Sequence, residues 1–154
     1  MEENLYSDDA RLYLQMMQEN IARMASNSAN AKTWLVTIVA AFLAIGCRLD
    51  EMHYWLLLAL VPVLALWYLD SYYLGLERAL RNRERKFMNI ANGRIQGVVK
   101  DHLYDFTPYY VDNDNQNLGY KIKRCQMFNK SVCPLYIIMI AIVVVITLII
   151  NNVQ

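Results

Sequence analysis

Glycine and proline are scarce in this chain of 154 residues, which has five glycines and three prolines. Because these two residues are the strongest breakers of regular structure, their scarcity allows long helices and is atypical of a β-barrel. Cysteine is also rare: Cys47, Cys125 and Cys133 match neither a disulfide framework nor a zinc-binding pattern. We expect the last two to remain thiols in a reducing cytosol.

The residue sets that carry catalysis or bind metals are missing too. No nucleophile is suggested with a base beside it, and the expected topology places His53 and His102 on opposite sides of a membrane. Asp112, Asp114 and Gln116 resemble the first half of a calcium loop, but the glycine at the sixth position and the glutamate at the twelfth are absent. A solvated turn is the favoured interpretation. We therefore expect a protein that is not an enzyme and needs no metal or cofactor.

What the chain does have is long apolar runs. Residues 132–150 read VCPLYIIMIAIVVVITLII, nineteen residues without a charge. As a helix they span about 28 Å, close to the hydrocarbon thickness of a bilayer. Two shorter runs, 33–47 and 54–69, are separated by only six residues and predict a tight helical hairpin. The fold class we predict is all-α: an integral membrane protein with three transmembrane helices.

Basic residues predict the orientation of these spans. Eleven Lys and Arg lie between Arg78 and Lys130, whereas the hairpin loop has one, Arg48. The positive-inside rule places the segment 78–130 in the cytoplasm, so the N-terminus lies inside and the C-terminus outside the membrane. The N-terminus, MEENLYSDDARLY, is acidic where a signal peptide would be basic and then apolar, so we expect no cleaved targeting segment.

Both hairpin helices are expected to extend into the cytoplasm. Leu14, Met17, Ile21 and Met24 recur at helical spacing, and the second helix keeps a helical period until a cap at Asn92-Gly93. Pro62 can kink that second helix in mid-span. The predicted organisation is an N-terminal amphipathic helix (1–31), a transmembrane hairpin (32–76), a cytosolic helical cap (77–131) and a C-terminal transmembrane helix (132–154).

Three groups of residues are candidates for function. Small and polar residues at three- or four-residue steps form a stripe on the first span, which either packs against another helix or lines a pore: Asn30, Thr33, Thr37, Ala41 and Ala44.

Asp70, at the inner end of the second span, is the candidate partner of Lys32, and we favour a structural or gating ion pair over an ion-coordination site. A basic cluster directly follows the membrane: Arg78, Arg81, Arg83, Arg85 and Lys86. It favours contact with anionic lipid, with a nucleotide or nucleic-acid ligand as the weaker alternative.

The words SNSANAKTW (26–34) and LDSYYLGLER (69–78), within a hairpin layout covering about residues 7–90, carry a resemblance. They look like small bacterial proteins found among defence genes, and more broadly they are similar to SLATT-type effectors. That family has a two-helix membrane hairpin with cytosolic helical extensions. The resemblance implies a homo-oligomer that is held quiet until a sensor detects infection and then opens or disrupts the inner membrane. This chain departs from the simple hairpin by its third span.

The resemblance thus implies a pore-forming membrane effector of bacterial antiviral defence, in the bacterial inner membrane. Its expected partners are the lipid bilayer, further copies of itself and a cytosolic sensor or regulatory protein. The alternative is a non-conducting membrane anchor whose cytosolic cap recruits or restrains a partner protein.

Overall fold

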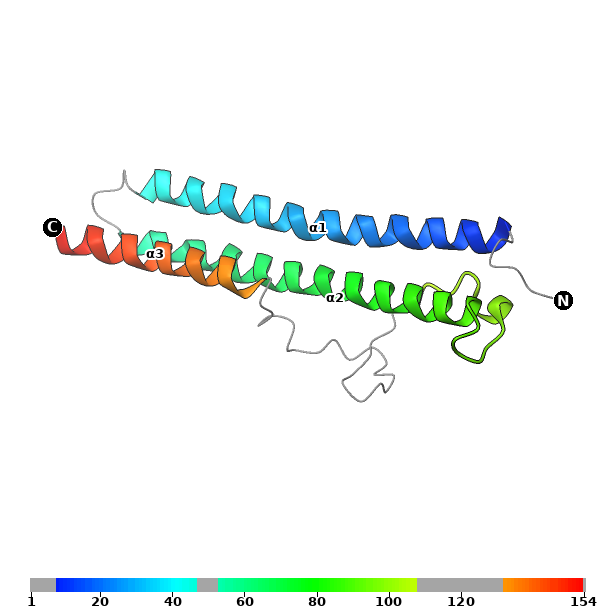
Figure 1. Ribbon diagram of the computed structural model, residues 1–154. Helices are drawn as coiled ribbons and strands as arrows, with labels where there is room; N and C mark the ends of the chain where they lie inside the picture. The colour runs from blue at the N-terminus through cyan, green and yellow to red at the C-terminus, as the bar shows by residue number, and fades with distance from the viewer. Residues whose placement is uncertain (1–7, 47–52, 108–131, 154) are drawn as a thin grey trace. The chain divides into compact units, whose positions relative to one another are not determined.

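The computed structural model describes residues 8–46, 53–107 and 132–153, and all regular structure in those ranges is helical. The elements, shown in Figure 1, are α1 (Asp8–Gly46), η1 (His53–Ala59), α2 (Leu60–Ala91), η2 (Val99–His102) and α3 (Cys133–Val153). Within the described residues, three helices are long and apolar enough to cross a membrane: Asp8–Gly46, Leu56–Ala91 and Cys133–Asn152. The predicted all-helical class and its three candidate spans are thereby confirmed.

Helix α1 joins the predicted amphipathic segment to the first apolar run without a break. It begins with Asp8 and Asp9, whose negative charges favour the positive end of the helix dipole. Its 39 residues extend over about 58 Å, nearly twice the roughly 30 Å hydrocarbon thickness of a bilayer. About half of α1 must therefore lie outside any membrane that it crosses.

The end of α2 is capped as its sequence predicts. Gly93 has a φ of 68°, a left-handed conformation that glycine adopts without a Cβ clash. Its N–H donates to the Ile90 carbonyl at 2.9 Å, and the Arg94 N–H donates to the Asn89 carbonyl at 2.8 Å. These two bonds form a Schellman motif, which satisfies carbonyls that the helix end leaves free.

Pro62 lies in the first turn of α2, inside the candidate span Leu56–Ala91. The preceding residues form the 3-10 helix η1, and the α-helix begins at Leu60. Proline has no backbone N–H, so Pro62 cannot donate a hydrogen bond to a carbonyl of the preceding turn. The proline therefore coincides with the change from 3-10 to α-helix.

The chain divides into two compact units. Unit 1 comprises, of the described residues, 8–26 and 74–107, and unit 2 comprises 27–46, 53–73 and 132–153. Helices α1 and α2 each contribute residues to both units.

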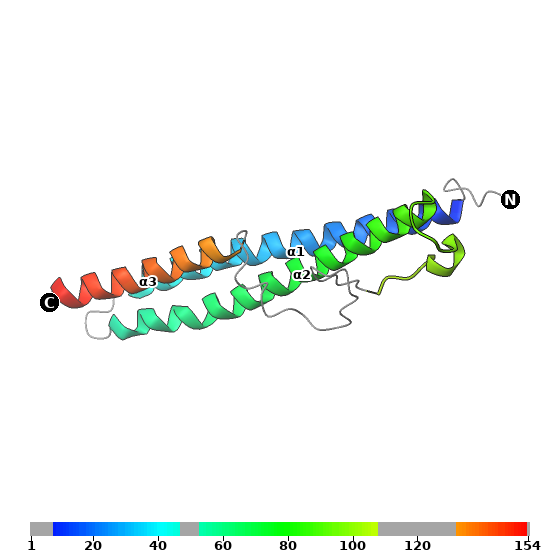
Figure 2. The ribbon, with the colours of Figure 1, turned by 60° about the horizontal axis from the view of Figure 1, so that its bottom comes forward.

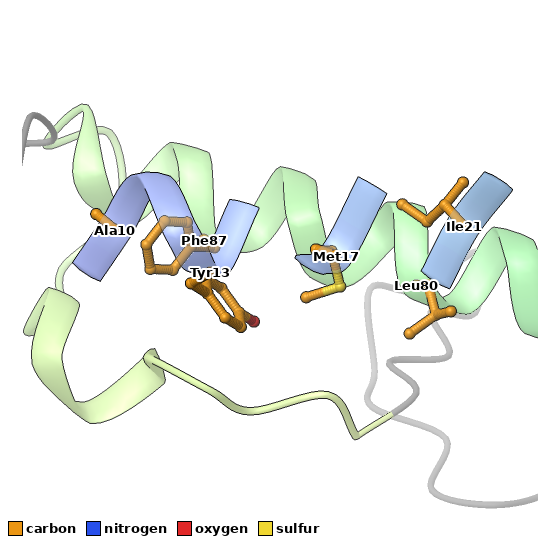
Figure 3. Packing of buried hydrophobic residues seen from close by; sticks show 6 residues of the cluster. All are labelled: Ala10, Tyr13, Met17, Ile21, Leu80 and Phe87. Atoms are coloured by element: carbon orange, nitrogen blue, oxygen red, sulfur yellow. The ribbon is translucent and has the colours of Figure 1, made fainter. Parts of the chain in front are cut away.

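In unit 1, α1 and α2 pack through a hydrophobic cluster whose buried members are labelled in Figure 3: Ala10, Tyr13, Met17, Ile21, Leu80 and Phe87. The rings of Tyr13 and Phe87 meet edge to face, with centroids 4.8 Å apart. All four residues of the predicted stripe (Leu14, Met17, Ile21 and Met24) belong to this cluster or pack against it. The two helical extensions are therefore held together by apolar burial.

After α2 the chain turns back through η2, as Figure 2 shows, and covers the cluster. Val99, Leu103 and Phe106 pack against the buried residues. Tyr104, between them, has a φ of 59°, in the left-handed region that non-glycine residues rarely adopt. Residues 108–131 of the predicted cap, Cys47 and Cys125 lie outside the described residues, as does the calcium-like loop around Asp112, Asp114 and Gln116.

In unit 2, α3 contacts η1 and packs against α2. The ring of Tyr136 stacks on Trp67 with centroids 5.8 Å apart and an angle of 8° between the ring planes. One stripe of α3 is buried, at Tyr136, Val143 and Thr147, and Val132, directly before the helix, is buried too. Large apolar side chains elsewhere on α3, such as Ile138 and Leu148, are exposed. An apolar surface of this kind suits contact with lipid.

Candidate functional site

Asp70 is the centre of a buried polar cluster in unit 2. Its side chain is 0% exposed, and its Oδ1 accepts hydrogen bonds from the Ser28 hydroxyl and from Lys32 Nζ, the latter at 2.9 Å. Lys32 Nζ also donates to Ser28 Oγ at 2.9 Å. Ser28 and Lys32 are one turn apart on α1, so both reach the same point of α2. The structure thus brings together the two residues that the sequence analysis paired.

Tyr136 adds the third helix to this cluster. Its hydroxyl lies beside the Asp70 carboxyl group and donates a hydrogen bond of 3.3 Å to the Leu66 carbonyl. The second oxygen of Asp70, Oδ2, is buried and has no hydrogen-bond partner in the described part of the chain. We call Ser28, Lys32, Asp70 and Tyr136 the Asp70 cluster.

The charge balance of the Asp70 cluster depends on Lys32. A carboxylate removed from water costs several kcal/mol unless a cation and hydrogen bonds compensate it. Lys32 supplies the cation, and its side chain is 35% exposed, so its ammonium group can leave towards a polar surface by a change of rotamer. Asp70 cannot follow, because it is fully enclosed. The pair is therefore a contact that one partner can break by itself.

The stripe of small and polar residues on α1 faces away from the other described residues of its unit. Every residue of the stripe (Asn30, Thr33, Thr37, Ala41 and Ala44) is exposed, whereas Ala31, Leu35 and Val39 on the other side of the helix are buried. Both threonine hydroxyls donate back along the helix: Thr33 to the Ala29 carbonyl at 3.3 Å, and Thr37 to the Thr33 carbonyl at 3.0 Å. We call this exposed face the threonine stripe.

The predicted basic cluster is divided in the structure. Arg78, Arg81 and Arg85 are exposed, and Arg81 pairs with Glu77 one turn away at 2.8 Å. Lys86 is partly buried. Arg83 is buried and forms a salt bridge with Asp105, so it is separated from the other four.

Asp105 fastens the returning chain to the helices of unit 1. Its carboxylate pairs with Arg83 and accepts the Thr107 N–H at 3.0 Å, while its carbonyl accepts the Tyr13 hydroxyl at 2.7 Å. Burial raises the pKa of Tyr13 above its ordinary value of 10.0, although the nearby Arg83 guanidinium acts in the opposite direction. The phenol therefore stays protonated and remains a hydrogen-bond donor at neutral pH.

Three residues of these arrangements were missed by the sequence analysis. Ser28 could have been found, because it precedes Lys32 by one helical turn. Tyr136 could have been noticed as a phenol within an otherwise apolar run. Nothing in the sequence pattern pointed to Asp105, whose partner Arg83 is 22 residues away along the chain.

Comparison of the chain with protein-family models, with curated proteins and with solved structures finds no match. Among the described residues, no three His, Cys, Asp or Glu side chains group together as a metal site would require.

Proposed function

We propose that this chain is a membrane effector of bacterial antiviral defence, which forms or gates an oligomeric pore and depolarises the inner membrane when activated. The threonine stripe is the observation that carries the proposal. It is exposed along a helix whose opposite face is buried against the same chain. The resemblance to SLATT-type effectors points in the same direction.

The chemistry of the stripe suits contact between copies. Small residues and hydroxyls let helix backbones approach closely in lipid, where no hydrophobic force drives helices together. Copies arranged around an axis with the stripe inward place Thr33 and Thr37 along a path. Their hydroxyl oxygens retain lone pairs that can accept hydrogen bonds from water.

The Lys32–Asp70 pair acts in this proposal as a latch that keeps the path closed. Thr33 directly follows Lys32 in α1, so a change at the latch reaches the stripe through one helix. Loss of the pair frees Lys32 and leaves Asp70 without its cation, which favours a rearrangement of α1 against α2. The latch lies near the cytosolic end of the path if the N-terminus is inside and the C-terminus outside, as the positive-inside rule predicts.

A non-conducting anchor is the second candidate, and one observation favours it. Because both threonine hydroxyls already donate to backbone carbonyls, they need no water and can lie in a dry helix–helix contact. In that case unit 1 recruits or restrains a cytosolic partner, with the exposed Arg78, Arg81 and Arg85 available to an anionic lipid or ligand.

The experiment that tests the proposal is a measurement of membrane potential in bacterial cells that produce the protein. We expect cells with the wild-type protein to keep their membrane potential. Cells with Asp70→Asn or Lys32→Met should lose it, because both substitutions break the latch. Adding Thr33→Leu and Thr37→Leu to Asp70→Asn should restore the potential by filling the path with apolar side chains.

The control is Val36→Leu in the Asp70→Asn protein, since Val36 is exposed on α1 but outside the threonine stripe. This variant should remain depolarising. If cells that contain Asp70→Asn or Lys32→Met at wild-type amounts in the membrane keep their full membrane potential, the pore is contradicted. The non-conducting anchor is then the remaining candidate.

A further inference from the structure

The outer face of α1 in unit 1 carries apolar side chains that none of the described residues of the unit cover. Leu12 is 48% exposed and Met16 is 37% exposed, although Tyr13 and Met17, each the next residue along, are fully buried. The two exposed residues are one turn apart and so are adjacent on the helix surface. The charged residues around them, Arg11 and Glu19, do not suit the interior of a bilayer. This apolar face is therefore unsuited both to lipid and to water.

The exposed residues follow the spacing of a helical seam. Leu12, Met16, Glu19 and Arg23 are separated by four, three and four residues, which is the heptad spacing by which one helix meets another. All four are exposed. The same spacing continues in the sequence at Ser26, Asn30, Thr33 and Thr37. We call the first four residues the α1 seam.

The charges of the α1 seam fit a second copy of this chain in the same orientation. Glu19 and Arg23 are one turn apart, about 6 Å along the helix axis. In parallel copies, Glu19 of one copy comes within reach of Arg23 of the next. Each side chain keeps capacity for such a bond: Glu19 Oε1 accepts from Gln15 and Arg23 Nη2 donates to Asn20, which leaves a carboxylate oxygen and further N–H groups.

A second copy matches these charges better than other partners do. The seam has one acidic and one basic residue and no net charge, whereas an anionic lipid surface or a nucleic acid selects for an excess of Lys and Arg. Copies inserted in one membrane share an orientation, so their α1 helices meet in parallel. Charged residues at seam positions reduce stability but fix the register of a coiled coil.

We propose that copies of this chain associate through the α1 seam, with Leu12 and Met16 in apolar contact and Glu19 paired across the interface with Arg23. This inference depends on the homo-oligomer of the proposed function and adds the face through which copies meet outside the membrane.

The test is a disulfide scan of the full-length protein in native membranes. Single cysteines at Leu12, Met16, Glu19 and Arg23 are introduced in a protein whose own Cys47, Cys125 and Cys133 are replaced by serine. A disulfide requires Cα atoms about 4–7 Å apart, so these four positions should form cross-linked dimers roughly tenfold faster than positions on other faces of α1. The matched controls are Gln18→Cys and Ala22→Cys, which are exposed and lie one residue, about 100° around the helix, before two seam positions.

A charge exchange keeps the proposal testable if cysteine disturbs the seam. Glu19→Arg or Arg23→Glu alone should each lower the oligomer fraction, and the two together should restore it, while Gln18→Arg should change nothing. Equal cross-linking at seam and control positions overturns the inference, as does a charge exchange that fails to restore assembly.

The scan also separates this inference from the proposed function. If the seam positions cross-link but the latch variants do not depolarise cells, the association through the α1 seam is supported and the pore is contradicted. If the latch variants depolarise cells but cross-links form on another face of α1, association through the α1 seam is contradicted and the pore is supported.

Discussion

Asp70 is a fully buried acidic residue that joins α2 to α1 through Lys32. Its carboxyl group is fully enclosed, and its Oδ1 accepts hydrogen bonds from Ser28 and Lys32 of α1. In a medium without water, the two partners of such a pair are not equivalent. The partner that can reach a polar surface tolerates separation, and the enclosed partner does not.

We therefore predict unequal effects from removing each partner. Lys32→Met leaves a buried, uncompensated carboxylate and should lower the free energy of unfolding by about 3 kcal/mol. Asp70→Asn removes the buried charge itself and should cost about half as much, since Lys32 is partly exposed. Thermal unfolding of the detergent-solubilised protein, followed by its helical circular dichroism, measures both effects.

The double variant Lys32→Met/Asp70→Asn supplies the control for this comparison. With neither charge present, it should be more stable than Lys32→Met alone. A larger loss for Asp70→Asn than for Lys32→Met contradicts this account of the latch.

Tyr13 gives a pH-dependent prediction in unit 1. Burial raises the pKa of Tyr13 above 10.0, so the folded phenol keeps its proton to higher pH than the unfolded one. Its contribution to stability is complete below about pH 10 and is lost as the pH rises further, because the unfolded chain then ionises first. Tyr13→Phe should cost about 1 kcal/mol near neutral pH by removing the hydrogen bond to the Asp105 carbonyl.

The measurement is the Tm of both proteins from about pH 8 to about pH 11, a range that brackets tyrosine ionisation. The difference between them should narrow as the pH rises, because only the wild-type protein has the buried phenol. A difference in Tm that stays constant over this range contradicts the effect of burial on the pKa of Tyr13. The ionisation of the other tyrosines affects both proteins equally and so does not change the difference.

Two helix ends, those of α1 and α2, each have a glycine, and a larger residue is unfavourable at the two positions for different reasons. Gly46 ends α1 close to η1, and a Cβ there would overlap the side chain of Leu56, which is 1% exposed. Gly93 caps α2 with a φ of 68°, and a Cβ there would meet nothing within 4 Å. The first position is therefore limited by packing and the second by backbone conformation.

This difference predicts the result of a double variant. Gly93→Ala should cost about 1 kcal/mol and should be unaffected by changes at Leu56. Gly46→Ala should lower the Tm further, and Leu56→Ala should make the two losses less than additive by removing the overlap. Strictly additive losses for Gly46→Ala and Leu56→Ala contradict a direct contact between these residues.

Periodicity predicted the helices of this chain well because their apolar stripes are long. The residues from Leu14 to Met24 and the Asn92-Gly93 cap gave α1 and the end of α2 correctly. Periodicity could not predict which residue of a run of polar side chains is buried. Arg83 lies within a run of exposed basic residues, and only the return of the chain to Asp105 separates it from them.

In the whole molecule, the sequence pattern of the third helix, α3, likewise does not show which of its residues are buried. Its sequence is uniform enough to predict a span, yet its inward face depends on which neighbours it meets. Tyr136 lies beside Asp70 because its ring stacks on Trp67, 69 residues earlier in the chain, and no local pattern records that pairing. The paired residues Lys32 and Asp70 were predictable because charges at span ends have few available partners.

We propose that this chain forms a path for ions that Asp70 helps to keep closed. The most direct test is ion efflux from liposomes that contain the purified Asp70→Asn protein, assembled and in a single orientation. We predict efflux well above that of empty liposomes, and its loss when Thr33→Leu and Thr37→Leu are added. Efflux no greater than that of empty liposomes, from protein that remains oligomeric, would contradict an ion path through this protein.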